Sequence, residues 1–254
     1  KNITLKDDLL GGNISGTTSK YKPLIDLAKV NGAVLENVLY SDNFSGGAVV
    51  LNNNKNIILK KILARTFGSG AAAHGILSSN NDGLTIINSF IGGADDLNAK
   101  TCWNSTNDKN ITIQYNTFYT NNKNNNQSVA FHNAKLIKSI AGNIFLGTPA
   151  SAAIAIGFDN TNGYVATLAT DFLEERDNVY LISGEWDTGL GFAGINEINA
   201  GNYTKINING GIPLATYQTN YNRGQNSILV AGRTEKIGFE SKSDVGIDDP
   251  VFLT

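Results

Sequence analysis

Short runs of alternating apolar and polar residues recur along the chain, and a corner segment follows each of the clearest ones. The runs at 84–87, 111–115 and 136–140 have the period-2 alternation of half-buried β-strands. Each leads into a three-residue segment with Asn first and Phe third: Asn88–Phe90, Asn116–Phe118 and Asn143–Phe145. The three Phe residues are 28 and 27 positions apart, and a fixed period in this range predicts a solenoid.

The same step extends the repeat in both directions. The apolar anchors it finds are Leu39, Phe67, Phe90, Phe118, Phe145, Phe172 and Ile198. The residues two before them are Asn37, Arg65, Asn88, Asn116, Asn143, Thr170 and Asn196. Asn tolerates the left-handed backbone region that a sharp corner needs, and stacked Asn amides can hydrogen-bond along a ladder. We therefore expect the Phe side chains to form one buried column and the Asn residues to form one column at the corners.

Each period contains three short extended runs and no helical pattern. In residues 100–121 these runs are 101–103, 111–115 and 117–119, and clusters of Asn, Ser and Lys separate them. Such strands cannot bury their faces alone, so they are expected to stack coil on coil, about 4.8 Å apart, into parallel sheets around one apolar core.

This repeat pattern resembles the right-handed parallel β-helix of the pectate-lyase and phage-tailspike superfamily. The likeness covers roughly residues 1–200 and lies in the repeat, with no catalytic motif of the family. It implies an all-β, right-handed, single-stranded parallel β-helix of roughly eight or nine coils, which acts on a polysaccharide.

The regular step fades after about residue 211, although apolar runs persist at 228–230 and 236–239. We interpret 1–210 as the parallel β-helix and 211–254 as a segment that caps it or joins protomers. The tailspike likeness implies a homotrimer.

Composition narrows the function classes. Charged residues make up 17% of the chain and the formal net charge is −2, so no basic stripe is visible and a nucleic acid partner is not expected. A neutral or weakly ionic ligand such as a polysaccharide suits this balance better. The single cysteine, Cys102, excludes an intrachain disulfide and a multi-cysteine metal site, and its position in a strand favours a buried apolar role.

Targeting and cofactor signals are weak. No apolar run reaches membrane-spanning length, no cofactor motif is present, and no cofactor or metal is expected. The chain begins at Lys1 and contains no Met, which we interpret as a processed or trimmed product. Richness in Asn, Gly, Ser and Thr is typical of extracellular, cell-surface or virion solenoids.

One row of polar residues is the best candidate site. Counting back 11 positions from 116, 143, 170 and 196 predicts a row on successive coils: Ser105, His132, Asp159 and Glu185. Because Phe131 and Phe158 should point inward, His132 and Asp159 should point outward.

This row would suit the cleavage of glycosidic bonds. Asp159 and Glu185 would stand about 5 Å apart, near the spacing of a retaining glycosidase, and one of them would be the acid. His132 would orient the sugar or act as a base, while Trp103 and Trp186 would stack on sugar faces. The alternative is an ordinary solvated strand face, on which Ser, His, Asp and Glu are common residues. A one-residue slip in the register would instead turn the row inward or scatter it.

A second, weaker candidate is the pair Asp95 and Asp96, which faintly resembles the paired aspartates of polygalacturonases. The other motifs of that family are missing, so its catalytic role is not carried over and an ordinary turn is the favoured interpretation. His74 lies in a loop of small residues and is expected to be a bystander.

Two functions follow from these patterns. The first is an extracellular or phage-tailspike-type protein that binds and degrades polysaccharide, as a glycoside hydrolase or a polysaccharide lyase. The alternative is a non-enzymatic adhesin or fibre protein in which the solenoid is a stiff spacer. Whether the protein is an enzyme stays open at this point. A groove lined by carboxylates and aromatics would favour the enzyme, and a smooth polar surface would favour the spacer.

Overall fold

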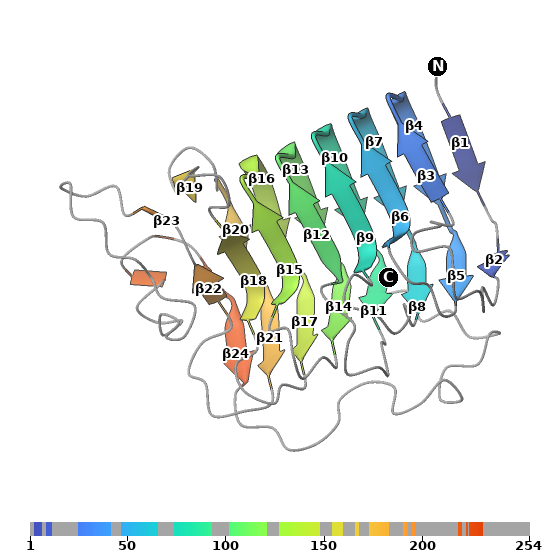
Figure 1. Cartoon of the computed structure of the whole chain (residues 1–254). Helices are drawn as coiled ribbons and strands as arrows, with labels where there is room; N and C mark the ends of the chain where they lie inside the picture. The colour runs from blue at the N-terminus through green and yellow to red at the C-terminus, as the bar shows by residue number, and fades with distance from the viewer. Residues whose placement is uncertain are drawn as a thin grey trace, which may run out of the picture.

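The computed structural model describes residues 3–6, 9–11, 25–41, 47–65, 74–92, 102–120, 127–147, 154–159, 166–167, 173–182, 190–192, 195–196, 218–219, 222 and 224–230. Apart from a helical turn at 218–219, the regular elements in these ranges are β-strands, and they form a stack of parallel sheets (Figure 1). The expected parallel β-solenoid is confirmed.

Three parallel sheets run the length of the solenoid, and each strand pairs with its equivalent on the neighbouring coil. Sheet A consists of β1 (Ile3–Lys6), β4 (Asn31–Glu36), β7 (Lys55–Lys60), β10 (Asp82–Ile87), β13 (Lys109–Gln114), β16 (Lys135–Ala141) and β20 (Glu175–Arg176). Sheet B consists of β2 (Leu9–Gly11), β5 (Leu39–Ser41), β8 (Leu63–Arg65), β11 (Phe90–Gly92), β14 (Thr117–Thr120), β17 (Ile144–Gly147), β21 (Val179–Ile182) and β24 (Ile228–Val230). Sheet C consists of β3 (Ile25–Ala28), β6 (Gly47–Asn52), β9 (His74–Ser79), β12 (Trp103–Thr106), β15 (Gln127–His132), β18 (Ile154–Asp159) and β22 (Leu190–Phe192). A separate pair is formed by β19 (Ala166–Thr167) and β23 (Ile195–Asn196).

One coil runs from sheet C through sheet A to sheet B. Two-residue corners join the strands, as at 53–54 between β6 and β7 and at 61–62 between β7 and β8. A longer connection then leads from sheet B to the next strand of sheet C, as from β8 to β9. The face of sheet A is therefore bounded by tight corners on both sides.

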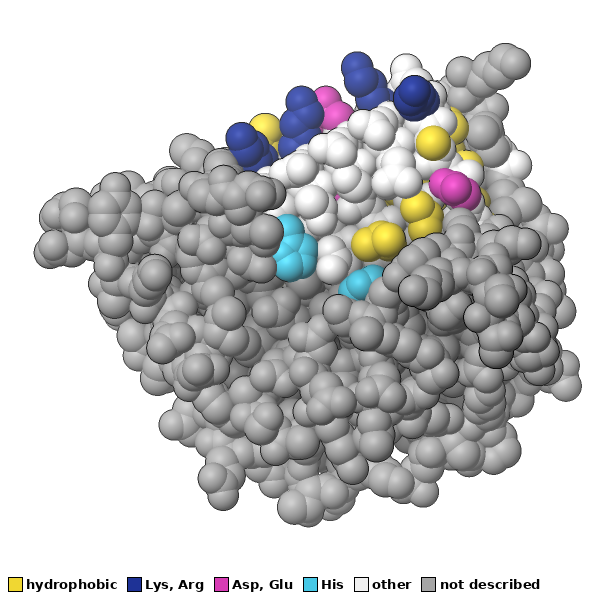
Figure 2. All heavy atoms as spheres, in the orientation of Figure 1, with side chains coloured by type: hydrophobic (Ala, Val, Ile, Leu, Met, Phe, Trp, Pro, Cys, Tyr) yellow, Lys and Arg dark blue, Asp and Glu magenta, His cyan; other side chains and the backbone are white. Residues whose placement is uncertain are grey.

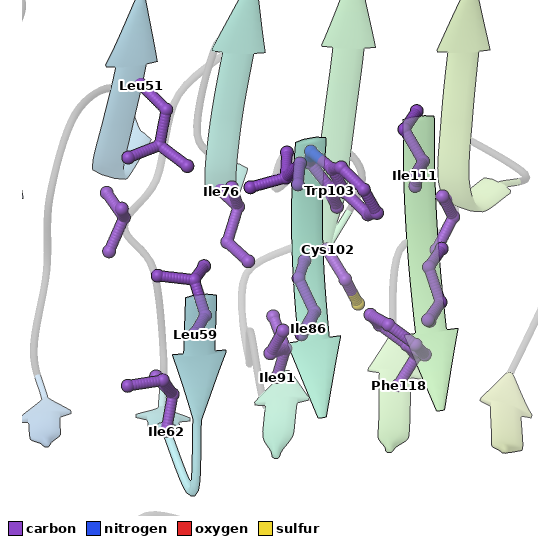
Figure 3. Close-up of a cluster of buried hydrophobic side chains, with 14 of the residues drawn as sticks. Leu51, Leu59, Ile62, Ile76, Ile86, Ile91, Cys102, Trp103, Ile111 and Phe118 are labelled. Carbon is purple, nitrogen blue, oxygen red and sulfur yellow. The ribbon is translucent and has the colours of Figure 1, made fainter. Parts of the chain in front are cut away.

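Alternate residues of each strand fill the interior. In β10, Leu84 and Ile86 are completely buried, and Leu84 is in register with Ile57 and Ile111 on the neighbouring coils. Figure 3 shows such side chains from several coils meeting in one continuous core. This stacking of apolar rows explains why the 27-residue step was visible in the sequence.

The aromatic column differs from the prediction at Phe90. Phe118 and Phe145 are buried and stack with ring centroids 5.3 Å apart and an interplanar angle of 11°. The next ring is Tyr180, whose centroid is 5.2 Å from that of Phe145. Ile91, not Phe90, is paired with Phe118, and Phe90 is only half-buried because it stands one position earlier on the strand. Phe67 and Phe172 lie outside the described residues.

The predicted Asn column is in fact two adjacent columns. Asn37 and Asn88 have left-handed φ values of 56° and 49°, and Tyr115 occupies the same corner position with φ 57°. Asn116 and Asn143 occupy the following position and are completely buried. The expectation that the corner Asn residues adopt a left-handed backbone is therefore confirmed for Asn37 and Asn88 and wrong for Asn116 and Asn143.

The buried column is a hydrogen-bonded ladder. Asn116 Oδ1 accepts the Ser89 backbone N–H, and Asn143 Oδ1 accepts that of Asn116, each at 2.9 Å. Asn178 Oδ1 continues the ladder by accepting the Asn143 N–H at 2.9 Å. Each side chain thus satisfies a backbone donor on the preceding coil, which the turn of the chain would otherwise leave buried without a partner.

A second ladder follows the corner between sheets C and A. Asn54 Oδ1 accepts the Val30 N–H at 2.9 Å, and Asn81 Oδ1 accepts the Asn54 N–H at 2.9 Å. Asp108 Oδ1 then accepts the Asn81 N–H at 2.7 Å. Both sheet corners are therefore held by buried polar side chains in register.

The segment 211–254, expected to cap the solenoid or join protomers, contributes at least one strand to the stack. β24 pairs in parallel with β21 as the next strand of sheet B. The capping and oligomerisation roles of this segment stay predictions.

Candidate functional site

The predicted polar row lies on sheet C, and two of its members are directly paired. His132 on β15 and Asp159 on β18 are Cα partners, and Thr106 on β12 is the partner of His132 on the other side. Ser79 and Asn52 continue this row toward the N-terminal coils. His132, Thr106, Ser79 and Asn52 are partly exposed, while Phe131 on the opposite face of β15 is completely buried.

Ser105 does not belong to the row, contrary to the prediction. It is the partner of Phe131 and is completely buried. The spacing of 11 residues between the row and the corner Asn does not hold for the coil that contains Ser105. β16 contains a register shift opposite the Ile111–Thr112 step, which adds one residue between His132 and Asn143. The preceding coil lacks this extra residue, so its outward member is Thr106.

The corner beside the row carries a second line of polar residues. Asn53, Asn80, Asn107 and Asn133 have φ values of 55–56°. The Asn107 N–H donates to the His132 carbonyl at 2.8 Å, and Asn80 Nδ2 donates to Ser79 Oγ at 2.8 Å. In Figure 2 uncharged polar surface spreads between the histidines and the basic side chains along the upper edge. Asn53, Asn80 and Asn107 are exposed and Asn133 is buried, so the strip presents corner amides on three coils beside the outward hydroxyl, amide and imidazole groups of the row.

Trp103 is a core residue, which corrects its assignment as a sugar-stacking side chain. It is completely buried, and its Nε1 donates to Ser78 Oγ at 2.7 Å. Its ring meets Phe131 edge-on, with centroids 5.5 Å apart and an angle of 74°. Trp103 shares the inward face of β12 with Ser105, because the two are two positions apart on one strand.

Four other proposed site residues lie outside the described residues: Glu185, Trp186, Asp95 and Asp96. β18 pairs with β22 so that Phe158 is opposite Phe192, and the row position after Asp159 therefore falls just beyond Phe192, not at Glu185. The strand register thus does not support the predicted stacking of Glu185 on Asp159, and the spacing between their carboxyl groups stays a prediction. His74, the expected bystander, begins β9 and is 6% exposed.

Cys102 is completely buried, and its Sγ lies 3.2 Å from the Tyr119 carbonyl oxygen. Burial raises the pKa of its thiol far above the usual range, so the group stays neutral and unreactive. The expected buried apolar role is confirmed.

A buried carboxyl that the sequence reasoning missed lies at Asp108. Its Oδ2 accepts the hydroxyls of Ser78 at 2.5 Å and Ser105 at 2.7 Å, and its Oδ1 accepts the Asn81 amide at 2.8 Å. Burial raises the pKa of Asp108, and these hydrogen bonds oppose the rise. The sequence signal that could have identified this carboxyl is the corner Asn107-Asp108, because Asp108 follows Asn54 and Asn81 at the same period.

A second buried carboxyl, Glu175, lies in a later coil. Its Oε1 accepts the Tyr180 hydroxyl at 2.5 Å and the Asn178 amide at 2.6 Å, and its Oε2 has no hydrogen-bond partner among the described residues. Burial raises the pKa of this carboxyl. Asp108 accepts from Ser78 and Asn81 of the preceding coil, and Glu175 Oε1 accepts the Ser227 hydroxyl of the following coil at 3.5 Å, so both carboxyls hold neighbouring coils together.

Within the described part of the chain, no group of three or more His, Cys, Asp and Glu side chains is placed to hold a metal ion. The same ranges contain no helix that is long and apolar enough to cross a membrane. No protein-family model, curated protein or solved structure matches the chain.

Proposed function

We propose that the protein is an extracellular, cell-surface or virion solenoid that binds an extended polysaccharide along the outer face of sheet C. The observation that carries the proposal is the in-register row of Ser79, Thr106, His132 and Asp159 on four consecutive strands. Neighbouring strands repeat the same position about every 4.8 Å, so a polymer with a regular repeat can make an equivalent contact on every coil.

The chemistry of the strip supports a sugar ligand. Ser79, Thr106 and the corner amides of Asn80 and Asn107 can both donate and accept hydrogen bonds, as sugar hydroxyls require. Equivalent donors on successive coils would bind several sugars at once, so modest individual contacts would add through multivalency.

Cleavage is the second step of the proposal. Asp159 and Glu185 would supply the acid and the nucleophile or base, and His132 would orient the sugar beside Asp159. The resemblance to pectate lyases and tailspikes supports cleavage of a polysaccharide, but a shared fold does not establish a shared reaction.

The non-enzymatic alternative also has a specific observation in its favour. The two buried ladders tie consecutive coils together at both corners, which suits a stiff spacer. Trp103 is buried, so it provides no sugar-stacking surface on the outer face of sheet C. On this reading the protein is an adhesin or fibre component, and the homotrimer inferred from the tailspike likeness is its natural assembly.

A polysaccharide panel tests the proposal. Binding would be measured on immobilised glycans, and cleavage by released reducing ends or unsaturated products. Thr106→Glu should abolish binding, while Asp159→Asn and Glu185→Gln should abolish cleavage and keep binding. Binding without cleavage would support the adhesin or fibre reading. Absence of binding to any glycan, or full binding by the Thr106 variant, would remove sheet C as the site.

A further inference from the structure

Basic side chains gather on the outer face of sheet A. The strands β4, β7, β10, β13 and β16, with the corner residues that follow them, contain six lysines, no arginine and two carboxylates. The lysines are Lys55, Lys60, Lys61, Lys109, Lys135 and Lys138, and the carboxylates are Glu36 and Asp82. This face therefore has an excess of four positive charges in a chain whose formal net charge is −2.

Both carboxylates are engaged by lysines of the same face. Glu36 lies 2.9 Å from Lys60, and Asp82 lies 3.2 Å from Lys109. Hydrogen bonds from Lys60 to Glu36 and from Asn110 to Asp82 lower the pKa of each carboxyl, so both are ionised at neutral pH. The positive excess therefore already takes the carboxylates of these five strands into account. Beside the last strand of the sheet, Glu174 and Asp177 both pair with Arg176.

The lysines are distributed over the face in two dimensions. Lys55, Lys109 and Lys135 stand at the border with sheet C, Lys61 stands at the border with sheet B, and Lys138 lies between the borders. Lys109 and Lys135 are direct partners on adjacent strands, an arrangement of like charges that costs stability. Figure 2 shows basic side chains spread along the upper edge, over the strands labelled β4 to β16 in Figure 1.

Apolar side chains are exposed among these lysines. Ile58 is 38% exposed and Leu136 is 39% exposed, on the second and fifth of these five strands. Thr85 and Thr112 lie between them on the same outward row as Ile58. A sheet face that combines long basic side chains with isolated exposed apolar groups has the properties of a surface that lies on an anionic interface.

We propose that the outer face of sheet A binds peripherally to lipid bilayers rich in anionic phospholipid. A planar partner can contact the lysines at both borders at the same time, whereas a single linear polyanion follows one row. The lysine stems reach the headgroup phosphates, and Ile58 and Leu136 contact the interface between them. This site is independent of the polysaccharide strip on sheet C.

Vesicle co-sedimentation tests this proposal, with phosphatidylcholine vesicles compared with vesicles that also contain phosphatidylserine. The whole chain should bind the anionic vesicles, should not bind the neutral ones, and should be released by high salt. Lys55→Gln/Lys61→Gln/Lys138→Gln removes three exposed lysines from the face and should weaken binding about 100-fold. Conversely, Gln114→Lys adds a lysine to the same face and should strengthen binding about fivefold.

The matched control is Lys20→Gln/Lys100→Gln/Lys123→Gln, which removes the same charge from connections between sheets B and C. This control should bind the anionic vesicles nearly as the original chain does. Equal weakening by the two triple variants would overturn the proposal, because it would reduce the effect to net charge. Binding to heparin or duplex DNA but not to vesicles would overturn it in favour of a linear polyanion.

Discussion

Asn143 accepts the backbone N–H of Asn116 through its Oδ1 at 2.9 Å, and both residues are completely buried. Replacing Asn143 with Ala would leave that donor and the Ile113 carbonyl, which accepts the Asn143 amide at 3.1 Å, without these partners. We expect the free energy of unfolding to fall by about 1–3 kcal/mol for each buried group left unsatisfied. Urea denaturation measures this loss.

The control for this prediction is Asn107→Gly. Asn107 is exposed and has a left-handed φ of 56°, which Gly adopts without strain. Its replacement should change the free energy of unfolding by no more than about 0.5 kcal/mol. If the two variants were equally stable, the ladder would contribute nothing measurable.

The second prediction concerns the aromatic column and compares the replacement of Phe118 with that of Phe90. Phe118→Ala should lower the free energy of unfolding by about 3–5 kcal/mol, because it opens a cavity beside the stacked ring of Phe145. Phe90→Ala should cost clearly less, because Phe90 is only half-buried. Equal losses in thermal or urea unfolding would contradict the register in which Ile91, rather than Phe90, is paired with Phe118.

Gly142 makes a third prediction. Its φ is +67°, and an added Cβ would lie 2.6 Å from Cδ1 of the Tyr115 ring. Gly142→Ala should therefore destabilise the protein through both backbone strain and this contact. Because Tyr115 is 51% exposed, its ring can be removed at little cost to the core. In a Tyr115→Ala background the Gly142→Ala loss should shrink but persist, and an unchanged loss would rule out the ring contact as a cause.

The buried carboxyl of Glu175 makes a prediction about pH. Burial raises its pKa in the folded state, so the folded protein holds the proton more tightly than the unfolded chain does. Its contribution to stability is therefore fully present below the unfolded pKa, near 4.5, and is lost as pH rises through the folded pKa. Partly exposed carboxyls such as Glu36 and Asp82, whose pKa values are lowered, have the opposite dependence.

Glu175→Gln isolates this effect. Gln keeps a side-chain oxygen to accept from Tyr180 and Asn178 but cannot ionise. Relative to the original chain, the variant should become progressively more stable as pH rises above about 4.5. Parallel curves of unfolding free energy against pH for the two proteins would mean that Glu175 does not titrate in this way.

The repeat was predictable from the sequence because apolar rows recur on every coil, as Leu84 and Ile111 illustrate. The exact register was not, because Asn serves two adjacent positions. Asn88 turns the corner and Asn116 fills the ladder, so an alignment on Asn alone slipped by one residue and misplaced Phe90. The two corner positions can be told apart only from which residues of the adjoining strands are buried.

The candidate site shows the same limit. The pairing of His132 with Asp159 followed from equal spacing on their coils. Ser105 and Trp103 were misassigned because the extra residue in β16 changed the count by one, which exchanges the two faces of a strand. The lysine face of sheet A was also invisible in composition, because its six lysines come from three separate coils.

The register of His132 and Asp159 is the central claim, because both the fold and the candidate site depend on it. The most direct measurement is disulfide formation in His132→Cys/Asp159→Cys, made in a Cys102→Ser background. Partners on adjacent parallel strands lie within the Cα separation of about 4.4–6.8 Å that a disulfide spans. We predict an intrachain disulfide on mild oxidation of this variant and little in the slipped control Phe131→Cys/Asp159→Cys. A disulfide in the control, with free thiols in the first variant, would contradict the account.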